Sequence, residues 1–509
     1  MSRTKKKGCN PLVGILILGG ILLIGLVSSL FVGKIMLNNW IKGDGLQALL
    51  QRKAAASLHS SVVIDEVKWQ GMKAFVGKFS ARGYEQAPFS SLELNAVRLD
   101  INGVKNNAFE IPAISVSQAT AEFSNDRLKD EPIATPVGDI SEEEVSREMP
   151  DWLKSRMPNR TEIGEIVIAS ATLEVKDDQG VSTMAIRETR ATINPELDTG
   201  VMEIRAQGGK LLFENAPDLN IRDSRLRFQG SNLFINDIAL EVYDGGHISG
   251  VGEIAFEEPP LVDLDLKVSG VDIKKVVNDN WKSKVSGTVR GPVKVTGTTE
   301  NMTMKGTLHL ENGVLESIPV LDKIGQYTKS KRFSRLVLNQ AQADFTVVGE
   351  QVELRNIQIE SDGLTRVEGA LDKNGEALAG VLNIGVTPGT LRWIPGAERS
   401  VFTEKRDGFV WTTMNIGGTT AQIREDLSGR LMTAAAMDIV DKLPVDVQDK
   451  LKGFIGLGGN STQPPADGTT SENPEGKNST DRVRDLIIEE TGETGRKLIE
   501  GLGKSLFGN

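Results

Sequence analysis

Side chains able to act as acid–base, nucleophilic or metal-binding groups are few and scattered in this chain of 509 residues. The histidines are His59, His247 and His309, and the only cysteine is Cys9. Metal sites and catalytic pairs need such residues at short, defined spacings, which the sequence lacks. His309 alternates with leucines in a strand-like run, so a solvent-facing strand histidine is the simplest interpretation. We therefore predict no catalytic residue and no metal ligand, and an anchored hydrolase is the least supported class of function.

One short motif imitates a nucleotide-binding loop near the C-terminal end. Gly503-Lys504-Ser505 matches the last residues of a phosphate-binding loop, but Leu498 stands where the leading glycine belongs. We discard the motif because the loop needs that glycine to cradle the phosphates, and we predict no cofactor-binding residue. The net charge of -10 argues against a nucleic-acid partner, because phosphate backbones attract basic surfaces.

The first structural element that the sequence predicts is an uncharged apolar run at residues 12–33. It follows a lysine-rich tail at residues 1–11. About 20 apolar residues in a helix cross a hydrocarbon core of about 30 Å. The positive-inside rule places the tail in the cytoplasm and the rest of the chain across the membrane. A cleaved signal peptide is the alternative, although its apolar core is usually only about 7–15 residues long. The sequence predicts a single-pass transmembrane helix at 12–33.

Beyond residue 60 the hydrophobic period changes to two, which is typical of strands with one apolar face. Apolar and charged side chains alternate from Val262 to Val268, and similar alternation recurs at 92–101, 163–175, 221–228, 289–295, 306–310, 343–347 and 352–354. Turn sequences lie between such runs at Asn102-Gly103, Asp244-Gly245-Gly246, Asn312-Gly313, Asp362-Gly363 and Asn374-Gly375. The alternation slips at Asn356, which indicates a β-bulge or a turn. The pattern predicts a mostly β fold with a few helices, built as an antiparallel meander.

The remaining segments are assigned from their composition and spacing. A helical stalk is predicted at 34–60, an N-terminal β module with a helix at 140–157 covers 61–160, and repeated strands cover 161–428. Shorter helices are predicted at 271–277 and 318–330, and a helical segment at 429–457. Residues 458–480 lack large apolar side chains and are expected to be a disordered linker. An amphipathic helix at 481–509 either docks onto the body or contacts a second membrane or an envelope protein partner.

Glycine spacing in the strand region is more specific than generic β composition. The stretches that carry it are Val268-Ser269-Gly270-Val271-Asp272-Ile273, Val285-Ser286-Gly287-Thr288-Val289, Val295-Thr296-Gly297, 304–315, Val367-Glu368-Gly369-Ala370-Leu371 and Asn415-Ile416-Gly417-Gly418-Thr419. In these stretches the chain resembles the AsmA-like family, the AsmA and TamB-type envelope proteins of the bridge-like lipid-transfer superfamily. The likeness is best at 268–427.

This resemblance implies an elongated, curled antiparallel β-sheet that forms a groove, in a protein anchored in the inner membrane with its bulk in the periplasm. It implies binding of phospholipid acyl chains in the groove and support of phospholipid transport or outer-membrane assembly. An apolar strand face suits this role, because each methylene removed from water contributes about 0.8 kcal/mol. The lipid-groove candidates are apolar side chains of the alternating strands: Leu264, Leu266, Leu308, Leu310, Phe345 and Leu354.

A second class of function fits the same sequence. If the β body has a filled core, the chain is a structural or assembly protein of the cell envelope that acts by binding protein partners. The two classes differ in one structural feature, because lipid binding needs an apolar face that other side chains of the protein leave uncovered.

Overall fold

The computed structural model describes residues 47–441, except for gaps at 130–159, 318–332 and 392–395 and shorter gaps of up to three residues. The predicted anchor at 12–33, the helices at 140–157 and 318–330, and everything beyond residue 441 lie outside the described residues. No helix in the described part of the chain combines the length and the hydropathy of a membrane-spanning segment.

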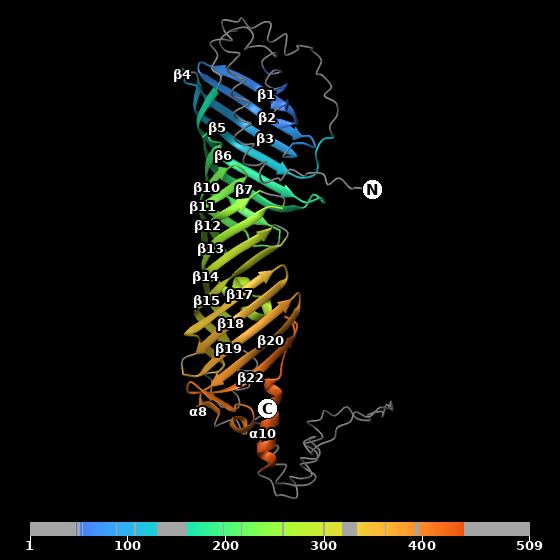
Figure 1. Ribbon diagram of the computed structural model, residues 1–509, viewed down its shortest axis with the longest axis vertical. Helices are drawn as coiled ribbons and strands as arrows, with labels where there is room; N and C mark the ends of the chain where they lie inside the picture. The colour runs from blue at the N-terminus through green and yellow to red at the C-terminus, as the bar shows by residue number, and fades with distance from the viewer. Residues whose placement is uncertain are drawn as a thin grey trace, which may run out of the picture. The chain divides into compact units, whose positions relative to one another are not determined.

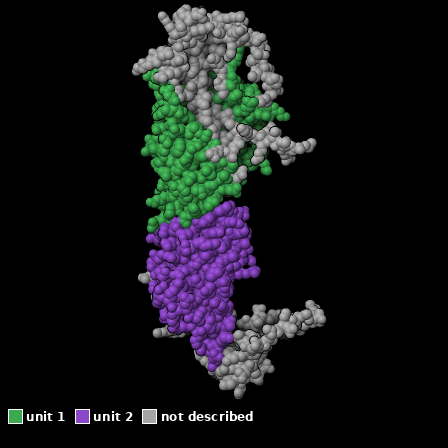
Figure 2. Space-filling model, viewed as in Figure 1, with its two compact units in different colours: residues 1–271, 290–306 green, residues 272–289, 307–509 purple. Residues whose placement is uncertain are grey.

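The chain divides into two compact units, each with its own hydrophobic core (Figure 2). Unit 1 comprises residues 1–271 and 290–306, and unit 2 comprises residues 272–289 and 307–509. Strands β14 (Val285–Thr298) and β15 (Met302–Glu316) contribute residues to both units. Strands dominate both units (Figure 1), which confirms the mostly β fold with a few short helices.

Unit 1 is built from long strands whose alternation the sequence shows. Its remaining strands are β1 (Ser60–Gln70), β2 (Lys73–Gly83), β3 (Ser91–Asp100), β4 (Gly103–Lys105), β5 (Ala108–Phe123), β6 (Arg160–Lys176), β7 (Ser182–Glu196), β8 (Val201–Gln207), β9 (Lys210–Phe213), β10 (Leu219–Gln229), β11 (Asn232–Val242), β12 (Gly246–Ala255) and β13 (Leu261–Asp272). The described pairings in this unit are antiparallel, except that β5 pairs with β6 in parallel. The parallel pair requires a crossover between residues 123 and 160, whereas antiparallel neighbours need only a turn.

The core of unit 1 contains side chains of strands from β1 to β10 and Phe256, which follows β12. Its largest fully buried side chains are Phe89, which precedes β3, and five residues from four strands: Ile64, Phe79, Leu99, Ile111 and Ile114. Ala54 and Leu58, from the helical residues that precede β1, lie in the same core. Gln51 of these helical residues donates its side-chain amide to the Ile64 carbonyl at 3.4 Å. Helix and strand are therefore joined by both apolar burial and a hydrogen bond.

Unit 2 combines strands with short helices at its C-terminal end. Its elements are α5 (Ile273–Val276), α6 (Asp279–Lys282), β16 (Arg335–Val337), β17 (Gln340–Val348), β18 (Gln351–Ser361), β19 (Thr365–Asn374), β20 (Ala377–Val386), α8 (Pro388–Leu391), α9 (Ala397–Ser400), β21 (Glu404–Arg406), β22 (Phe409–Gly418), β23 (Ile423–Glu425) and α10 (Leu427–Val440). Its core joins side chains of β20 and β22 to those of α8, α9 and α10, with Phe402 and Val410 at 0% exposed. These helices close one end of the apolar sheet face in this unit.

Most predicted turns and irregularities are confirmed. Hairpins close at Asp244-Gly245, between Ser361 and Thr365, and at Asn374-Gly375, as the register of the flanking strands shows. Asn356 has a positive φ of 49° at a register shift between β18 and β19, so the phase slip marks a β-bulge. The turn predicted at Asn312-Gly313 is wrong. β15 continues through these residues, because Asn312 at φ 52° forms an irregularity inside the strand.

Candidate functional site

The predicted groove residues lie on four strands and are all half-buried. Leu264 and Leu266 lie on β13 in unit 1. Leu308 and Leu310 lie on β15, Phe345 on β17 and Leu354 on β18, all in unit 2. Leu310 packs against the core of unit 2, and none of these side chains is itself a buried core residue of the described chain. Each unit therefore has a filled core and, next to it, a stretch of apolar face that is only partly covered.

In unit 1 the partly covered face belongs to β12 and β13. Val262, Leu264, Leu266 and Val268 point to one side of β13, since the intervening Asp263, Asp265 and Lys267 are exposed on the other. Directly opposite on β12 are Ile254, Gly252, Gly250 and Ile248. Paired residues of antiparallel strands share a face, so these eight positions form one apolar patch. Val262 is buried and Ile254 packs against the core of unit 1, so the partly covered portion is the remainder of the patch.

Glycines opposite the leucines shape this patch. A Cβ added to Gly250 would lie 2.8 Å from Leu266 Cδ2, and a Cβ added to Gly252 would lie 2.7 Å from Leu264 Cδ2. Each leucine therefore occupies the space that a side chain on the neighbouring strand would fill. Neither glycine has a positive φ. The added Cβ atoms would also lie 2.3 Å from the carbonyl oxygens of Asp265 and Asp263, so the close approach of the β13 backbone requires glycine at these positions together with the leucines.

In unit 2 the equivalent face crosses β17, β18, β19 and β20. Phe345 pairs with Leu354, Leu354 pairs with Leu371, and Leu371 pairs with Gly380. The register thus places Phe345 and Leu354 together, as neighbours in one apolar row. A Cβ on Gly380 would lie 2.5 Å from Leu371 Cδ2, which repeats the leucine-over-glycine packing of unit 1.

The opposite face of these strands is polar and held by ion pairs and hydrogen bonds. In unit 1, Lys294 of β14 bridges Asp263 and Asp265 of β13, with its Nζ 2.9 Å from Asp265 Oδ2, and these contacts raise the pKa of Lys294. In unit 2, Asp344 accepts hydrogen bonds from Asn356 at 2.8 Å and from Thr307 at 2.6 Å. These two bonds hold the pKa of Asp344 below its ordinary value. In each unit, these strands therefore have one polar face and one apolar face.

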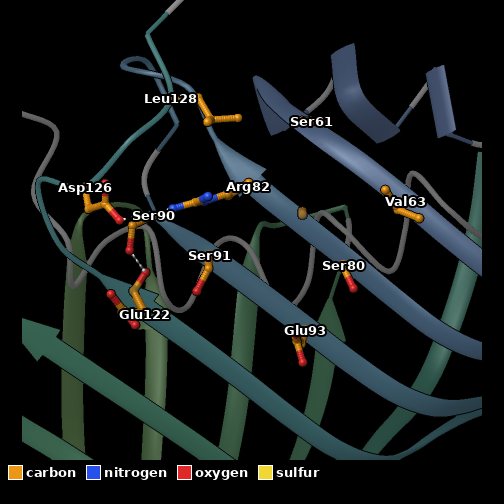
Figure 3. A pocket seen from close by; sticks show the side chains of 11 residues that line it. Ser61, Val63, Ser80, Arg82, Ser90, Ser91, Glu93, Glu122, Asp126 and Leu128 are labelled. Atoms are coloured by element: carbon orange, nitrogen blue, oxygen red, sulfur yellow. Dashed lines mark hydrogen bonds and ion pairs between the residues drawn. The ribbon is translucent and has the colours of Figure 1, made fainter.

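A hollow of about 500 Å³ in unit 1 is lined by none of the apolar candidates and has a lining of polar and apolar side chains (Figure 3). It is built on β1, β2, β3 and the residues that follow β5. Arg82 forms an ion pair with Asp126 at 3.1 Å, and Ser90 Oγ donates to the Glu122 carbonyl at 2.9 Å. Hydroxyl and charged groups line this hollow together with Val63, Ala81 and Leu128, so an alkyl chain placed in it would lie beside charged side chains.

Two histidines, which could act as acid–base groups or metal ligands, lie on separate strands in the described part of the chain. His247 lies on β12 and His309 on β15. No set of three or more histidine, cysteine, aspartate or glutamate side chains among the described residues could hold a metal ion.

Sequence reasoning missed the leucines that extend the apolar face in unit 2. Leu371 on β19 and Leu382 on β20 are half-buried on the face that carries Leu354. The alternation from Val367 to Leu371 is visible in the sequence, and could have identified Leu371 as a candidate. The opposing glycines carry no such signal, because only the strand register reveals their partners.

Comparison with known families identifies the region that carries these faces. Residues 236–383 match the model of the TamB C-terminal domain. This range runs from β11 to β20 and contains every predicted groove residue. The match confirms the resemblance to AsmA and TamB-type proteins within the strand region. No curated protein and no solved structure matches the chain.

Proposed function

Since residues 236–383 match the model of the TamB C-terminal domain, we propose that this protein binds phospholipid acyl chains on its partly covered apolar sheet faces. This lipid binding supports phospholipid transport or outer-membrane assembly. The TamB family belongs to the cell envelope, which supports this class of function. No step of the proposed function requires a catalytic residue or a cofactor.

The observation that carries the proposal is the incomplete burial of the apolar face. Leu264 and Leu266 in unit 1, and Leu308, Phe345 and Leu354 in unit 2, are half-buried and lie outside the filled cores of the described chain. An acyl chain laid against such a face leaves water, and each buried methylene contributes about 0.8 kcal/mol. The polar face of the same strands stays hydrated, so a phospholipid headgroup has water within reach.

Membrane attachment is a further part of the proposal. Residues 12–33 anchor the chain in the inner membrane, residues 1–11 remain in the cytoplasm and the β-rich body lies in the periplasm. The support is the uncharged run and the basic tail that precedes it. The terminal segment at 481–509 then provides a second contact, with an envelope protein or a membrane.

A photo-cross-linking scan of the full chain in its host membrane tests the proposal. Benzophenone side chains replace Leu264, Leu266, Leu308, Phe345 and Leu354 one at a time, and Lys267 and Asp372 serve as controls on the polar face. We expect phospholipid adducts at the apolar positions and none at the controls, because only the apolar face offers an environment for alkyl chains.

The scan also separates lipid binding from the assembly role. Protein adducts at the apolar positions, without phospholipid, would favour a structural protein whose face is covered by a partner. Phospholipid adducts that are as frequent at the controls would show only general proximity to a membrane, and would contradict a specific lipid-binding face.

A further inference from the structure

We infer that the leucines that pack over glycines outside the filled cores, Leu264, Leu266 and Leu371, are the dominant acyl-chain contacts of this protein. This inference rests on the proposed lipid-binding function and ranks the positions within it. It adds Leu371 to the binding face, and gives Leu354 and Phe345 a smaller share. The observation that supports the inference is the packing of a leucine over a glycine of the neighbouring strand, which occurs in both units.

The packing recurs in directly opposed pairs. In unit 1, Leu266 opposes Gly250 and Leu264 opposes Gly252; in unit 2, Leu371 opposes Gly380. Leu382 opposes Gly369 in the same way, but it packs against the core of unit 2 and is not counted among the binding leucines. A Cβ on any of these glycines would lie between 2.5 and 2.9 Å from the Cδ2 atom of its leucine, closer than two carbon atoms can approach. The leucine therefore lies across the glycine and supplies the apolar surface of two strands.

This arrangement makes each of these leucines harder to replace than its neighbours. Where two large side chains face each other, truncation of one leaves the other to cover part of the exposed backbone. Where a leucine faces a glycine, truncation leaves no side chain on the opposing strand. A bound alkyl chain would then contact peptide groups instead of methyl groups, and much of the hydrophobic gain would be lost.

Unit 2 offers a matched pair of leucines for a test. Leu371 faces Leu354 on one side and Gly380 on the other. Leu354 faces Phe345 and Leu371, so large side chains flank it on both sides. Both leucines are half-buried, and the alanine substitution removes the same atoms from each.

The experiment titrates the purified full chain with phosphatidylethanolamine that carries a fluorescent acyl chain. Leu371→Ala should weaken binding roughly fivefold, whereas Leu354→Ala should change it by less than about twofold. Leu371→Met keeps a side chain of similar volume over Gly380 and should retain the wild-type affinity. Leu266→Ala provides a second test in unit 1, in case Leu371→Ala fails to fold.

The possible outcomes distinguish this inference from the function on which it rests. Equal weakening by Leu371→Ala and Leu354→Ala, with wild-type binding intact, would overturn the ranking and leave lipid binding standing. Absence of binding by the wild-type chain would overturn the proposed function itself. Unequal weakening with rescue by Leu371→Met supports both.

Discussion

At the scale of single residues, Asp344 links two irregular strands on the polar face of unit 2. Its carboxylate accepts from Asn356, the bulged residue of β18, and from Thr307 of β15. A bulge leaves one residue outside the regular ladder, so a side-chain hydrogen bond from that residue fixes its conformation. The phase slip seen in the sequence thus corresponds to a residue with a specific hydrogen-bond partner.

Replacement of Asp344 by Asn should make stability less dependent on pH. The hydrogen bonds from Asn356 and Thr307 lower the pKa of Asp344 from 3.8, so their contribution is complete at neutral pH. As the pH falls below 3.8 and through the lowered pKa, the wild type loses this contribution and Asp344→Asn has none to lose. Melting temperatures at pH 7 should therefore favour the wild type, with a gap that shrinks on acidification. An equal melting temperature at pH 7 would contradict this account.

At the scale of elements, regular alternation was the reliable signal. The run from Val262 to Val268 forms β13, and its charged residues are exposed, as predicted.

The error at Asn312-Gly313 arose because an Asn-Gly pair suits a hairpin turn and a bulge equally well, since both need a positive φ. Helices α8 and α9 were missed because four residues are too few to show a helical period. The parallel pairing of β5 and β6 depends on a long crossover, which local patterns do not encode.

Helix α10 should be a major source of stability in unit 2. Leu431 is 1% exposed and lies in the core with side chains of β20 and β22. Leu431→Ala should lower the free energy of unfolding by about 2–5 kcal/mol, because it removes buried methyl groups and leaves a cavity. Thr433→Ala, at an exposed position of the same helix, is the matched control and should change it by less than about 0.5 kcal/mol. Chemical denaturation measures both, and similar losses would rule out a core role for α10.

At the scale of the whole molecule, the sequence does not predict which apolar strand residues lie in a filled core and which lie on a partly covered face. Alternation predicts that a strand has one apolar face, and Leu264 and Ile64 both satisfy that rule. Ile64 is 0% exposed and Leu264 is half-buried, because burial depends on what packs across the sheet. That packing is set by tertiary neighbours such as Ala54 and Leu58, which lie in the core of unit 1 with Ile64. The candidate face could therefore be predicted, and its degree of coverage could not.

The phospholipid content of the purified full chain, measured by mass spectrometry, tests the central claim most directly. Leu266→Asp places a carboxylate on the apolar face, and Lys267→Asp places the same group on the polar face one residue away. An alkyl chain avoids a desolvated charge, so Leu266→Asp should lose much of the bound phospholipid and Lys267→Asp should retain it. A wild-type chain without phospholipid, or equal retention by the two variants, would contradict lipid binding on this face.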